Sequence, residues 1–467
     1  MSSRWGNRYA VLGLIAVVAG TIGVAVPAGA GRMCQGERVT ITGTRDDDRL
    51  RGTPGRDVID GRSGHDHIIG RGGNDVLCGG RGPDLLRGGG GNDRLDGGPG
   101  GDELLGGAGN DIQRGGRGGF TFHLPGPGND RVVGTPAFDF VGFFEATAGV
   151  EANLAEGTAI GEGDDTIIAA DGLGGSDFDD VLTGSDGPNF FEGGPGNDEI
   201  STGGNAGSFD NPDTAEAADF VAPDFFAPTD SAAPRGDDTV VGGAGIEVML
   251  YDGAAQGVDV NLNSGRAVGE GTDTLTDVQA AIGSQFDDTM TGDNADNAFA
   301  PLAGSNTVNG GPGNDVGVYF DSLGPVTADL GAGTASGTFR TFTGDMQESE
   351  ASGTDSLSQI ENVWGSPQAD TLTGDGGANE LYGMDEDDDL AGAAGNDILD
   401  GGNGTDELDG GEGTDQCVNG ETVIGCESSP RPTAASPFRW LSFARAWDSY
   451  APGDSLIMKR WASWFWL

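Results

Sequence analysis

Apolar residues recur with a period of nine between Gly43 and Arg114. This stretch divides without gaps into eight nonapeptides, from GTRDDDRLR through GGGGNDRLD to GGAGNDIQR. Position 1 is Gly and position 6 is Asp in all eight copies, and position 8 is aliphatic in seven of them. The closing triplet suits a short strand with one inward side chain, and the glycine-rich start suits a tight turn. The pattern therefore predicts one turn and one strand every nine residues.

A second array of six nonapeptides runs from Gly365 to Val418, and shorter patches occupy residues 175–201 and 283–318. In the second array Asn379 replaces the aspartate once, and Cys417 takes the apolar position of the last copy. Two nonapeptides would make one coil of a flattened helix. Alternate repeats would then stack, with their aspartates about 4.8 Å apart along each edge.

The strongly acidic composition of the chain predicts that its partners are cations. The chain of 467 residues has 90 glycines, 75 acidic against 24 basic residues and a formal net charge of −51, which excludes a general nucleic-acid binder. Hydrophobic residues make up 35%, below the roughly 45–50% of typical globular domains, so a conventional core is not expected over much of the length. Disorder is the alternative interpretation of this composition, but a disordered tract would not keep the repeat in phase.

Rows of carboxylates at strand spacing repel one another unless a hard divalent cation lies between them. Calcium accepts six to eight oxygen ligands from flexible carboxylates and carbonyls, whereas the stricter octahedron of magnesium fits less well. One buried aliphatic residue in nine does not offset the conformational entropy of ordering the chain. We therefore expect multiple Ca²⁺ ions as cofactors, and arrays that are largely unfolded without them.

The motif GG-x-G-x-D-x-U-x, as in residues 97–105 and 401–409, resembles the RTX, or hemolysin-type, calcium-binding nonapeptide. The resemblance implies an all-β fold, a parallel β-roll or β-helix (solenoid), with interspersed β modules. It also implies calcium ligation by Asp side chains and backbone carbonyls of the first six residues. The implied metal ligands are Asp48, Asp57, Asp66, Asp75, Asp84, Asp93, Asp102 and Asp111 in the first array, and Asp370, Asp388, Asp397, Asp406 and Asp415 in the second.

Two copies depart from the motif, because Asp46 and Glu386 stand at position 4 in place of glycine. Both departures predict distorted sites. The segment from Cys34 to Cys78 and the sequence GTDQCVNGETVIGCE are similar to the two ends of secreted actinobacterial calcium-binding repeat proteins.

A longer repeat lies between the arrays. Residues 149–166 align without gaps with residues 257–274 at an offset of 108, and a third copy begins at residue 324 after allowing a 14-residue insertion. Each module feeds an alternating β segment into a nonapeptide patch. The position-6 residues of these patches and of isolated repeats add Asp130, Asp180, Asp198, Asp238, Asp288 and Asp315 to the predicted metal ligands. The repeats that follow with Asn189, Asn297 and Asn379 are interpreted as coils that maintain the stack without metal.

The chain begins with a secretory signal pattern. Arg4 and Arg8 precede an apolar run over residues 10–26 that ends in Pro27 and the triplet AGA. The pattern predicts a secreted, extracellular protein, which includes a protein attached to the cell surface. The alternative is that the segment is not cleaved and serves as a membrane anchor.

The four cysteines of an exported chain suggest two disulfides rather than a metal cluster. Of the three possible pairings, the local pairs Cys34 with Cys78 and Cys417 with Cys426 are favoured. Neither spacing matches a zinc motif, and three histidines are too few to supply one.

Seven segments summarise the expected organisation. They are a signal peptide at 1–30, a first array at 31–134, a β module with a patch at 135–201, a linker or loop at 202–235, a second β module at 236–318, a third module with the second array and a disulfide cap at 319–427, and a Trp-rich basic tail at 428–467. In the tail, Trp440, Phe443 and Trp447 would share one helical face suited to a membrane surface, or the tail is an extension without function.

The sequence contains no H-E-x-x-H, no G-x-S-x-G and no P-loop, so we expect no enzymatic activity. The leading hypothesis is a secreted protein that binds multiple calcium ions and folds on them. The alternative is a calcium-rigidified adhesin or matrix protein that holds an extracellular carbohydrate or protein. A polysaccharide-modifying enzyme is a third, weaker hypothesis.

Overall fold

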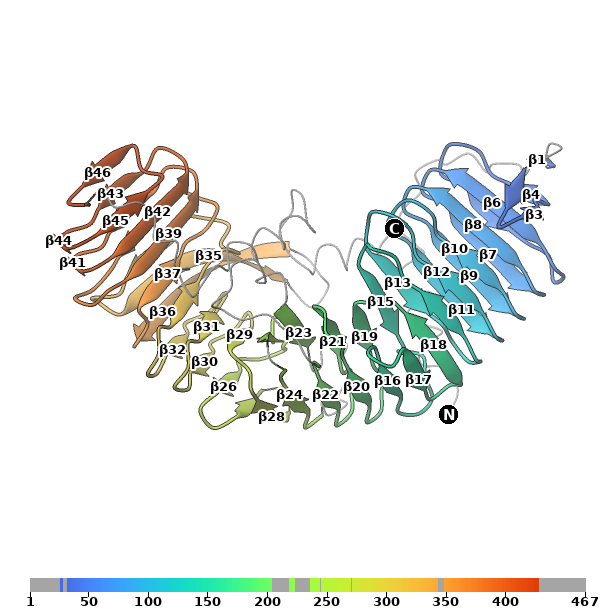
Figure 1. Ribbon diagram of the computed structural model, residues 1–467, viewed down its shortest axis with the longest axis horizontal. Coiled ribbons are helices and arrows are strands. Elements are labelled where there is room, and N and C mark those ends of the chain that lie inside the picture. Colours follow the sequence, from blue (N-terminus) through green and yellow to red (C-terminus); the bar gives the residue numbers. More distant parts are fainter. Residues whose placement is uncertain are drawn as a thin grey trace. The chain divides into compact units, whose positions relative to one another are not determined.

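The computed structural model describes residues 26–27, 32–203, 218–222, 236–243, 245–269, 271–342 and 348–427. The predicted signal peptide and linker lie largely, and the tail entirely, outside the described residues. These residues form two compact units, one ending at Gly196 and one beginning at Asn197. Each unit is an all-β solenoid of stacked coils (Figure 1). Within the described part of the chain, no helix is long and apolar enough to cross a membrane.

In the first unit, each coil contributes one strand to each of two parallel sheets. The first sheet contains β4 (Ile41–Thr42), β6 (Val58–Ser63), β8 (Val76–Arg81), β10 (Arg94–Asp96), β12 (Ile112–Arg114), β14 (Arg131–Val133) and β18 (Asp164–Ile168). The second sheet contains β5 (Arg49–Arg51), β7 (His67–Gly72), β9 (Leu85–Gly90), β11 (Glu103–Ala108), β13 (Thr121–Leu124), β15 (Asp139–Gly142), β19 (Gly172–Gly174) and β21 (Phe190–Glu192). Two nonapeptides thus make one coil, as the repeat predicts.

The register confirms this coil length. Leu50 pairs with Ile68, Ile68 with Leu86, and Leu86 with Leu104, so successive partners are one coil of 18 residues apart. The position-8 side chains form one core cluster, with none more than 4% exposed. Its members are Leu50, Ile59, Ile68, Leu77, Leu86, Leu95 and Leu104. The inward position inferred from the sequence pattern is therefore correct.

Glycine serves two different purposes in the turns. Gly98, at position 2, has a φ of 97°, and Gly100, at position 4, has a φ of 154°, both values that side chains with a Cβ rarely adopt. Gly97, at position 1, has no positive φ, but a Cβ there would collide with Oδ2 of Asp102 in its own turn. Position 1 is glycine because the aspartate side chain folds back over it.

A polar group ends the apolar core of the first array. Gln113 takes the position-8 place in the last copy and is fully buried. Its Oε1 lies 3.2 Å from Nδ1 of His123, whose Nε2 lies 2.9 Å from Oδ1 of Asp139. His123 and Asp139 are also fully buried, so this departure from the repeat is satisfied by polar partners rather than by packing.

A β-hairpin interrupts the coils of the first unit. The chain of β16 (Glu151–Asn153) turns back into β17 (Thr158–Ile160), which pairs antiparallel with β18. β16 then pairs in parallel with β20 (Val181–Thr183), the strand of the following patch. The alternating segment predicted between the arrays is this hairpin.

The second unit repeats the same design. Its first sheet contains β22 (Glu199–Ser201), β24 (Thr239–Val241), β26 (Asp259–Asn261), β27 (Arg266–Val268), β28 (Thr272–Thr276), β30 (Thr289–Thr291), β32 (Thr307–Asn309), β34 (Thr327–Asp329), β35 (Thr334–Phe342), β36 (Glu348–Ser358), β38 (Thr371–Thr373), β40 (Asp389–Ala391), β43 (Glu407–Asp409) and β46 (Thr422–Ile424). Its second sheet contains β23 (Ala218–Ala222), β25 (Ile246–Leu250), β29 (Ala280–Ile282), β31 (Ala298–Ala300), β33 (Val316–Val318), β37 (Asn362–Trp364), β39 (Glu380–Asp385), β42 (Ile398–Asn403) and β45 (Gln416–Val418).

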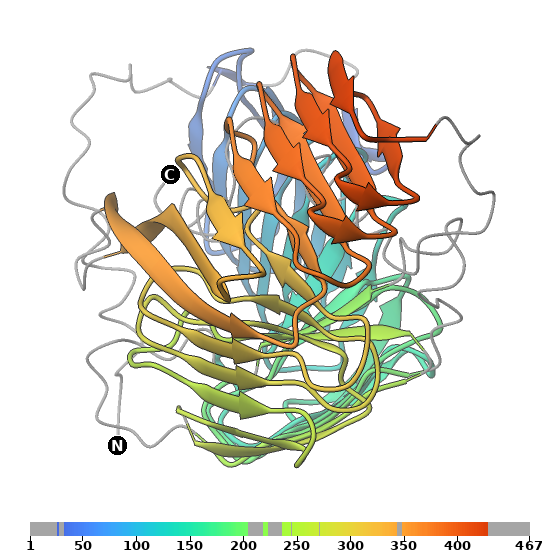
Figure 2. The ribbon, with the colours of Figure 1, turned by 90° about the vertical axis from the view of Figure 1, so that its left-hand side faces the viewer.

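Two hairpins of this unit match the duplicated modules. β27 pairs antiparallel with β26 and β28, and β35 pairs antiparallel with β34 and β36. Two short parallel strands, β41 (Ala394–Gly395) and β44 (Glu412–Gly413), join turns of the second array. The orange and red coils in Figure 2 lie one on the next, with their turns in rows.

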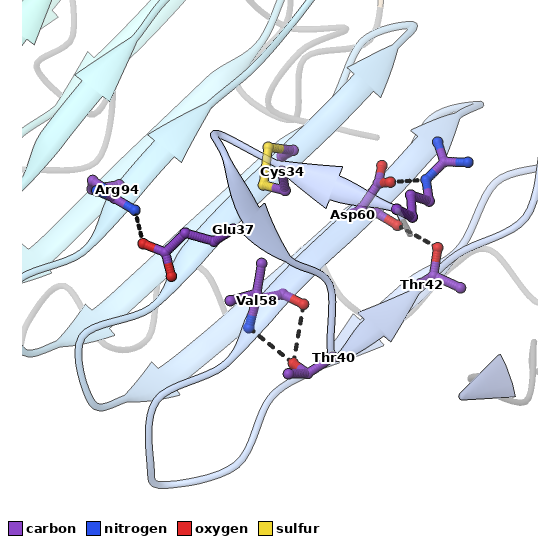
Figure 3. The surroundings of a disulfide bond; sticks show 9 residues. Cys34, Glu37, Thr40, Thr42, Val58, Asp60 and Arg94 are labelled. Carbon is purple, nitrogen blue, oxygen red and sulfur yellow. Dashed lines mark hydrogen bonds and ion pairs between the residues drawn. A yellow bond between two sulfur atoms is a disulfide. The ribbon is translucent and has the colours of Figure 1, made fainter. Parts of the chain in front are cut away.

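Both predicted disulfides are present, Cys34 with Cys78 and Cys417 with Cys426. The first ties a small hairpin, β2 (Met33–Cys34) and β3 (Glu37–Arg38), to strand β8 (Figure 3). Glu37 of this hairpin forms ion pairs with Arg56 and Arg94. The hairpin therefore covers the start of the first array. A further short strand, β1 (Val26–Pro27), pairs antiparallel with β4.

Candidate metal sites

The predicted aspartates lie in the turns, directly before a strand. Asp66 precedes β7, for example, and Asp84 precedes β9. All nineteen predicted ligand residues are buried, with none more than 6% exposed. Burial of so many carboxylates requires partners, because an isolated buried charge is strongly unfavourable.

In the rows, Oδ1 of one aspartate accepts a hydrogen bond from the preceding coil. The backbone N–H of Asp48 donates to Oδ1 of Asp66 at 2.9 Å, and the N–H of Asp66 donates to Oδ1 of Asp84 at 2.8 Å. The same bond, at 2.9 Å, runs from the N–H of Asp388 to Oδ1 of Asp406 in the second array. Position-6 residues therefore form continuous rows along the edges of the coils.

The second oxygen has no hydrogen-bond partner in twelve of these residues. They are Asp66, Asp75, Asp84, Asp93, Asp102, Asp111, Asp130, Asp315, Asp388, Asp397, Asp406 and Asp415. Each of these side chains is at most 3% exposed. A buried anionic oxygen without a donor is rare in folded proteins, and a bound cation would satisfy it.

Backbone carbonyls of neighbouring coils approach the same places. A Cβ added at Gly88 would collide with both Oδ2 of Asp93 and the carbonyl oxygen of Gly106, one coil later. One added at Gly79 would collide with both Oδ2 of Asp84 and the carbonyl oxygen of Gly97. No group of three or more His, Cys, Asp or Glu side chains gathers at one point in the described ranges. A metal ion here would therefore combine few carboxylates with carbonyl oxygens, a donor set that suits calcium.

Burial also raises the pKa of these carboxyl groups. The pKa of Asp84 and of Asp93 is raised to about 7, chiefly because the charged form loses its hydration. The pKa of Asp102 and of Asp388 is raised to about 8, since neighbouring carboxylates add repulsion to the effect of burial. A cation bound in these turns would therefore displace protons near neutral pH.

Five predicted ligands have a different environment. In the turns of Asp48, Asp57, Asp180, Asp288 and Asp370, position 2 is Ser or Thr. The N–H of Ser366 donates to Oδ2 of Asp370 at 2.5 Å, and its hydroxyl donates to Oδ1 at 2.8 Å. Thr53 donates both its N–H and its hydroxyl to Oδ2 of Asp57, at 2.5 and 2.9 Å. These carboxylates are satisfied within their own turns.

The asparagine turns are closed by hydrogen bonds as well. Oδ1 of Asn379 accepts the N–H of Asp375 at 2.8 Å, and its Nδ2 donates to the carbonyl of Glu361 at 2.7 Å. Asn297 likewise accepts the N–H of Asp293 at 2.8 Å. These contacts agree with the interpretation that the asparagine coils maintain the stack.

Sequence analysis missed several acidic members of the rows. Asp165 accepts the N–H of Asp130 at 2.7 Å, and Asp273 accepts that of Asp238 at 3.3 Å. Each is the last residue of a G-x-G-x-D segment, GEGDD or GEGTD, which corresponds to positions 2 to 6 of the repeat without its first glycine. Searching for that fragment would have found them.

Glutamates complete the rows at their ends. Oε2 of Glu421 accepts the N–H of Asp406 at 2.8 Å, and Oε2 of Glu427 accepts that of Asp415 at 2.6 Å. Glu361 accepts the N–H of Asp315 at 2.9 Å. The longer side chain reaches the row from a loop that no longer follows the nine-residue frame, so the repeat pattern gave no signal for it.

A parallel β-solenoid with rows of buried turn aspartates is a β-roll of the metal-binding class. The family model of the RTX calcium-binding nonapeptide repeat matches residues 42–77, 79–118, 174–208, 282–316, 358–388 and 382–417. These matches cover both arrays and the patches between them, so the chain contains RTX calcium-binding nonapeptide repeats. A search of curated proteins found no match.

Proposed function

We propose that this protein is a secreted, non-enzymatic calcium-binding protein whose coils fold when several Ca²⁺ ions bind. The observation that carries the proposal is the set of twelve buried Oδ2 atoms without a hydrogen-bond donor. Calcium would neutralise these oxygens and take its remaining ligands from turn carbonyls. Two disulfides support export, because such bonds persist in oxidising compartments.

Calorimetric calcium titration of the chain without residues 1–30 tests this function. We expect several bound ions per chain, release of protons on binding at neutral pH, and a gain of β signal in circular dichroism. A chelator should reverse that gain. A chain that binds no calcium, or that keeps the full β spectrum in chelator, would contradict the proposal.

A second candidate function is adhesion to an extracellular carbohydrate. Phe178 and Phe286 occupy the same position of two modules and are 45% and 44% exposed. Exposed aromatic rings at corresponding turns suit stacking on sugar rings. Glycan-array binding that needs calcium and disappears in a F178A/F286A variant would favour this candidate, and binding unaffected by the substitutions would count against it.

The absence of enzymatic activity is part of the proposal. The position-6 aspartates are accounted for by the rows, and the sequence contains no H-E-x-x-H, G-x-S-x-G or P-loop motif. Incubation with acidic polysaccharides in calcium, followed by chromatography of the products, should show no cleavage.

A further inference from the structure

The turns of this protein divide into two conformational kinds. We call a turn open when Oδ2 of its position-6 aspartate has no hydrogen-bond partner, and capped when a position-2 Ser or Thr donates to that carboxylate. The twelve open turns carry the partnerless aspartates given above, and the capped turns carry Asp48, Asp57, Asp180, Asp288 and Asp370.

The backbone at position 2 separates the two kinds completely. In all twelve open turns this residue has a φ between 70° and 117°, including Arg62, Met384 and Ala393, for which that conformation is strained. Among the described residues, none of the capped turns has a position-2 residue with positive φ. The kind of turn is therefore set by which backbone conformation position 2 adopts.

This difference redirects one backbone N–H. In the open turn of Asp84, the N–H of Gly80 donates to the carbonyl of Gly97, one coil later, at 2.9 Å. In the capped turn of Asp57, the corresponding N–H of Thr53 donates to the carboxylate of its own turn. In an open turn the position-2 N–H therefore does not donate to the aspartate, whereas in a capped turn it does.

The number of donors on neighbouring carboxylates shows the consequence. Asp370 accepts three hydrogen bonds, from the N–H and hydroxyl of Ser366 and from the N–H of Val326 at 2.7 Å. Asp388, the next member of the same row, accepts the N–H of Asp370 at 2.8 Å on Oδ1, and its Oδ2 accepts none. A cation beside Asp370 would have to displace bonds that already satisfy the charge, whereas a cation beside Asp388 would satisfy an oxygen that has no other partner.

The capped turns also occupy consistent positions, either before an open turn in a row or after a hairpin strand. Asp48 comes before Asp66 in its row, Asp57 before Asp75, and Asp370 before Asp388. Asp180 and Asp288 follow the hairpin strands β16 and β26, where they accept the N–H groups of Val150 and Val258. Asp48, Asp57 and Asp370 are thus each the first aspartate of a row, and an open turn is stacked on each of them.

We propose that calcium binds only in the open turns, and that capped turns are metal-free. This inference rests on the proposed calcium function and narrows it. Asp48, Asp57, Asp180, Asp288 and Asp370 match the repeat motif at position 6 but would not be ligands. Position 2 would then distinguish a calcium-binding repeat from one closed by hydrogen bonds.

Paired substitutions in one row test the proposal. D57N changes a capped turn, and D75N changes the open turn stacked on it, with the same loss of charge. Calcium stoichiometry is measured by calorimetry and equilibrium dialysis on the full disulfide-bonded chain. We expect D57N to bind as many ions as the wild type and D75N to bind at least one ion fewer.

A gain-of-binding variant complements the pair. T53G removes the capping hydroxyl, allows positive φ and converts GTPGRD into the GGPGRD motif, so it should bind one more ion than the wild type. Equal losses in D57N and D75N, or an unchanged number in T53G, would overturn the inference. If D75N does not fold, the pair D370N and D388N in the second unit provides the same comparison.

The outcomes separate this inference from the proposed function. A wild-type chain that binds no calcium would refute the function itself. A wild-type chain that binds calcium, with D57N and D75N equally impaired, would refute only the division of the turns.

Discussion

The first array and the module over residues 245–269 and 271–309 reach the same coil geometry by different means. In the array, six of eight turns leave a buried carboxylate oxygen without a donor, and the core is a single column of aliphatic side chains. In the module, Ser284 caps Asp288, Asn297 replaces an aspartate, and the hydroxyl of Tyr251 donates to Asp273 at 3.0 Å. The array leaves carboxylate oxygens without donors where the module has hydrogen bonds.

The cores also differ in composition. Met249, Met290 and Phe299 of the module are fully buried, and the small Ala281 lies between Met249 and Phe299 in the second sheet. The array instead has a uniform set of leucine and isoleucine side chains. Because hydrogen bonds close the turns of the module, we expect it to hold its coils with less help from ions than the array.

Removal of calcium should produce the largest difference between the array and the module. In chelator, backbone amides of residues 43–114 should lose protection from hydrogen exchange, because the rows of carboxylates then repel. Amides of the module should stay protected. Exchange measured by mass spectrometry of peptides with and without chelator checks this, and equal exchange in both segments would show that hydrogen-bonded turns do not replace the ion.

The substitution F299A should give the next largest effect. Truncation of a buried phenylalanine typically costs about 3–5 kcal/mol, and Phe299 is fully buried in the second sheet of the module. The free energy of unfolding should fall in the module with or without calcium. Denaturant titration in both conditions measures it, and L95A is the matched control in the array, where the loss should be observable only with calcium bound.

The substitution S284A should have a smaller effect. It removes the hydroxyl that donates to Oδ1 of Asp288 at 2.7 Å, and hydrogen bonds to charged groups contribute about 1.5–3 kcal/mol. We expect a loss at the lower end of that range, since the N–H of Ser284 still donates to Oδ2 at 2.7 Å. Thermal unfolding of the calcium-free chain measures the loss, with S305A, an exposed serine of the same module, as the control.

A change of pH should produce the smallest and most selective effect. The pKa of Asp102 is raised to about 8 and that of Asp288 to about 6, in both cases chiefly by burial. A folded state with raised carboxyl pKa values binds more protons than the unfolded chain, so the calcium-free fold gains stability as pH falls. Between pH 8 and 7 we expect β signal to increase in the array and not in the module. Hydrogen exchange of peptides from both segments, measured across this pH range, tests whether the array gains protection and the module does not.

The nine-residue pattern was sufficient to predict the coil of two repeats, the inward side chain at position 8 and the rows of aspartates along the edges, but not the burial of these aspartates. Each follows from local geometry that every copy repeats. The favoured cysteine pairs were also correct. The pattern did not reveal that position 1 must be glycine because of the folded-back carboxylate, since that contact appears only when Asp102 is placed over Gly97.

The repeat was least informative where the chain leaves its frame. Asp165 and Asp273 join the rows from hairpins, and Glu421 reaches its row from a loop. Their roles depend on the pairing of strands that are distant from the motif. The two conformations of position 2 were equally hidden, because Gly80 and Thr53 occupy the same place in the repeat and differ in φ only once the turns are built.

The glutamates at the ends of the rows have a consequence for self-association. A stack whose last coil offers unpaired N–H groups is a template for another molecule, and end-to-end growth into fibres is the usual hazard of repeating β folds. Glu421 and Glu427 accept the N–H groups of Asp406 and Asp415 from within the same chain. A second copy would have to displace them to continue the row, so these two side chains oppose end-to-end association at these two row ends.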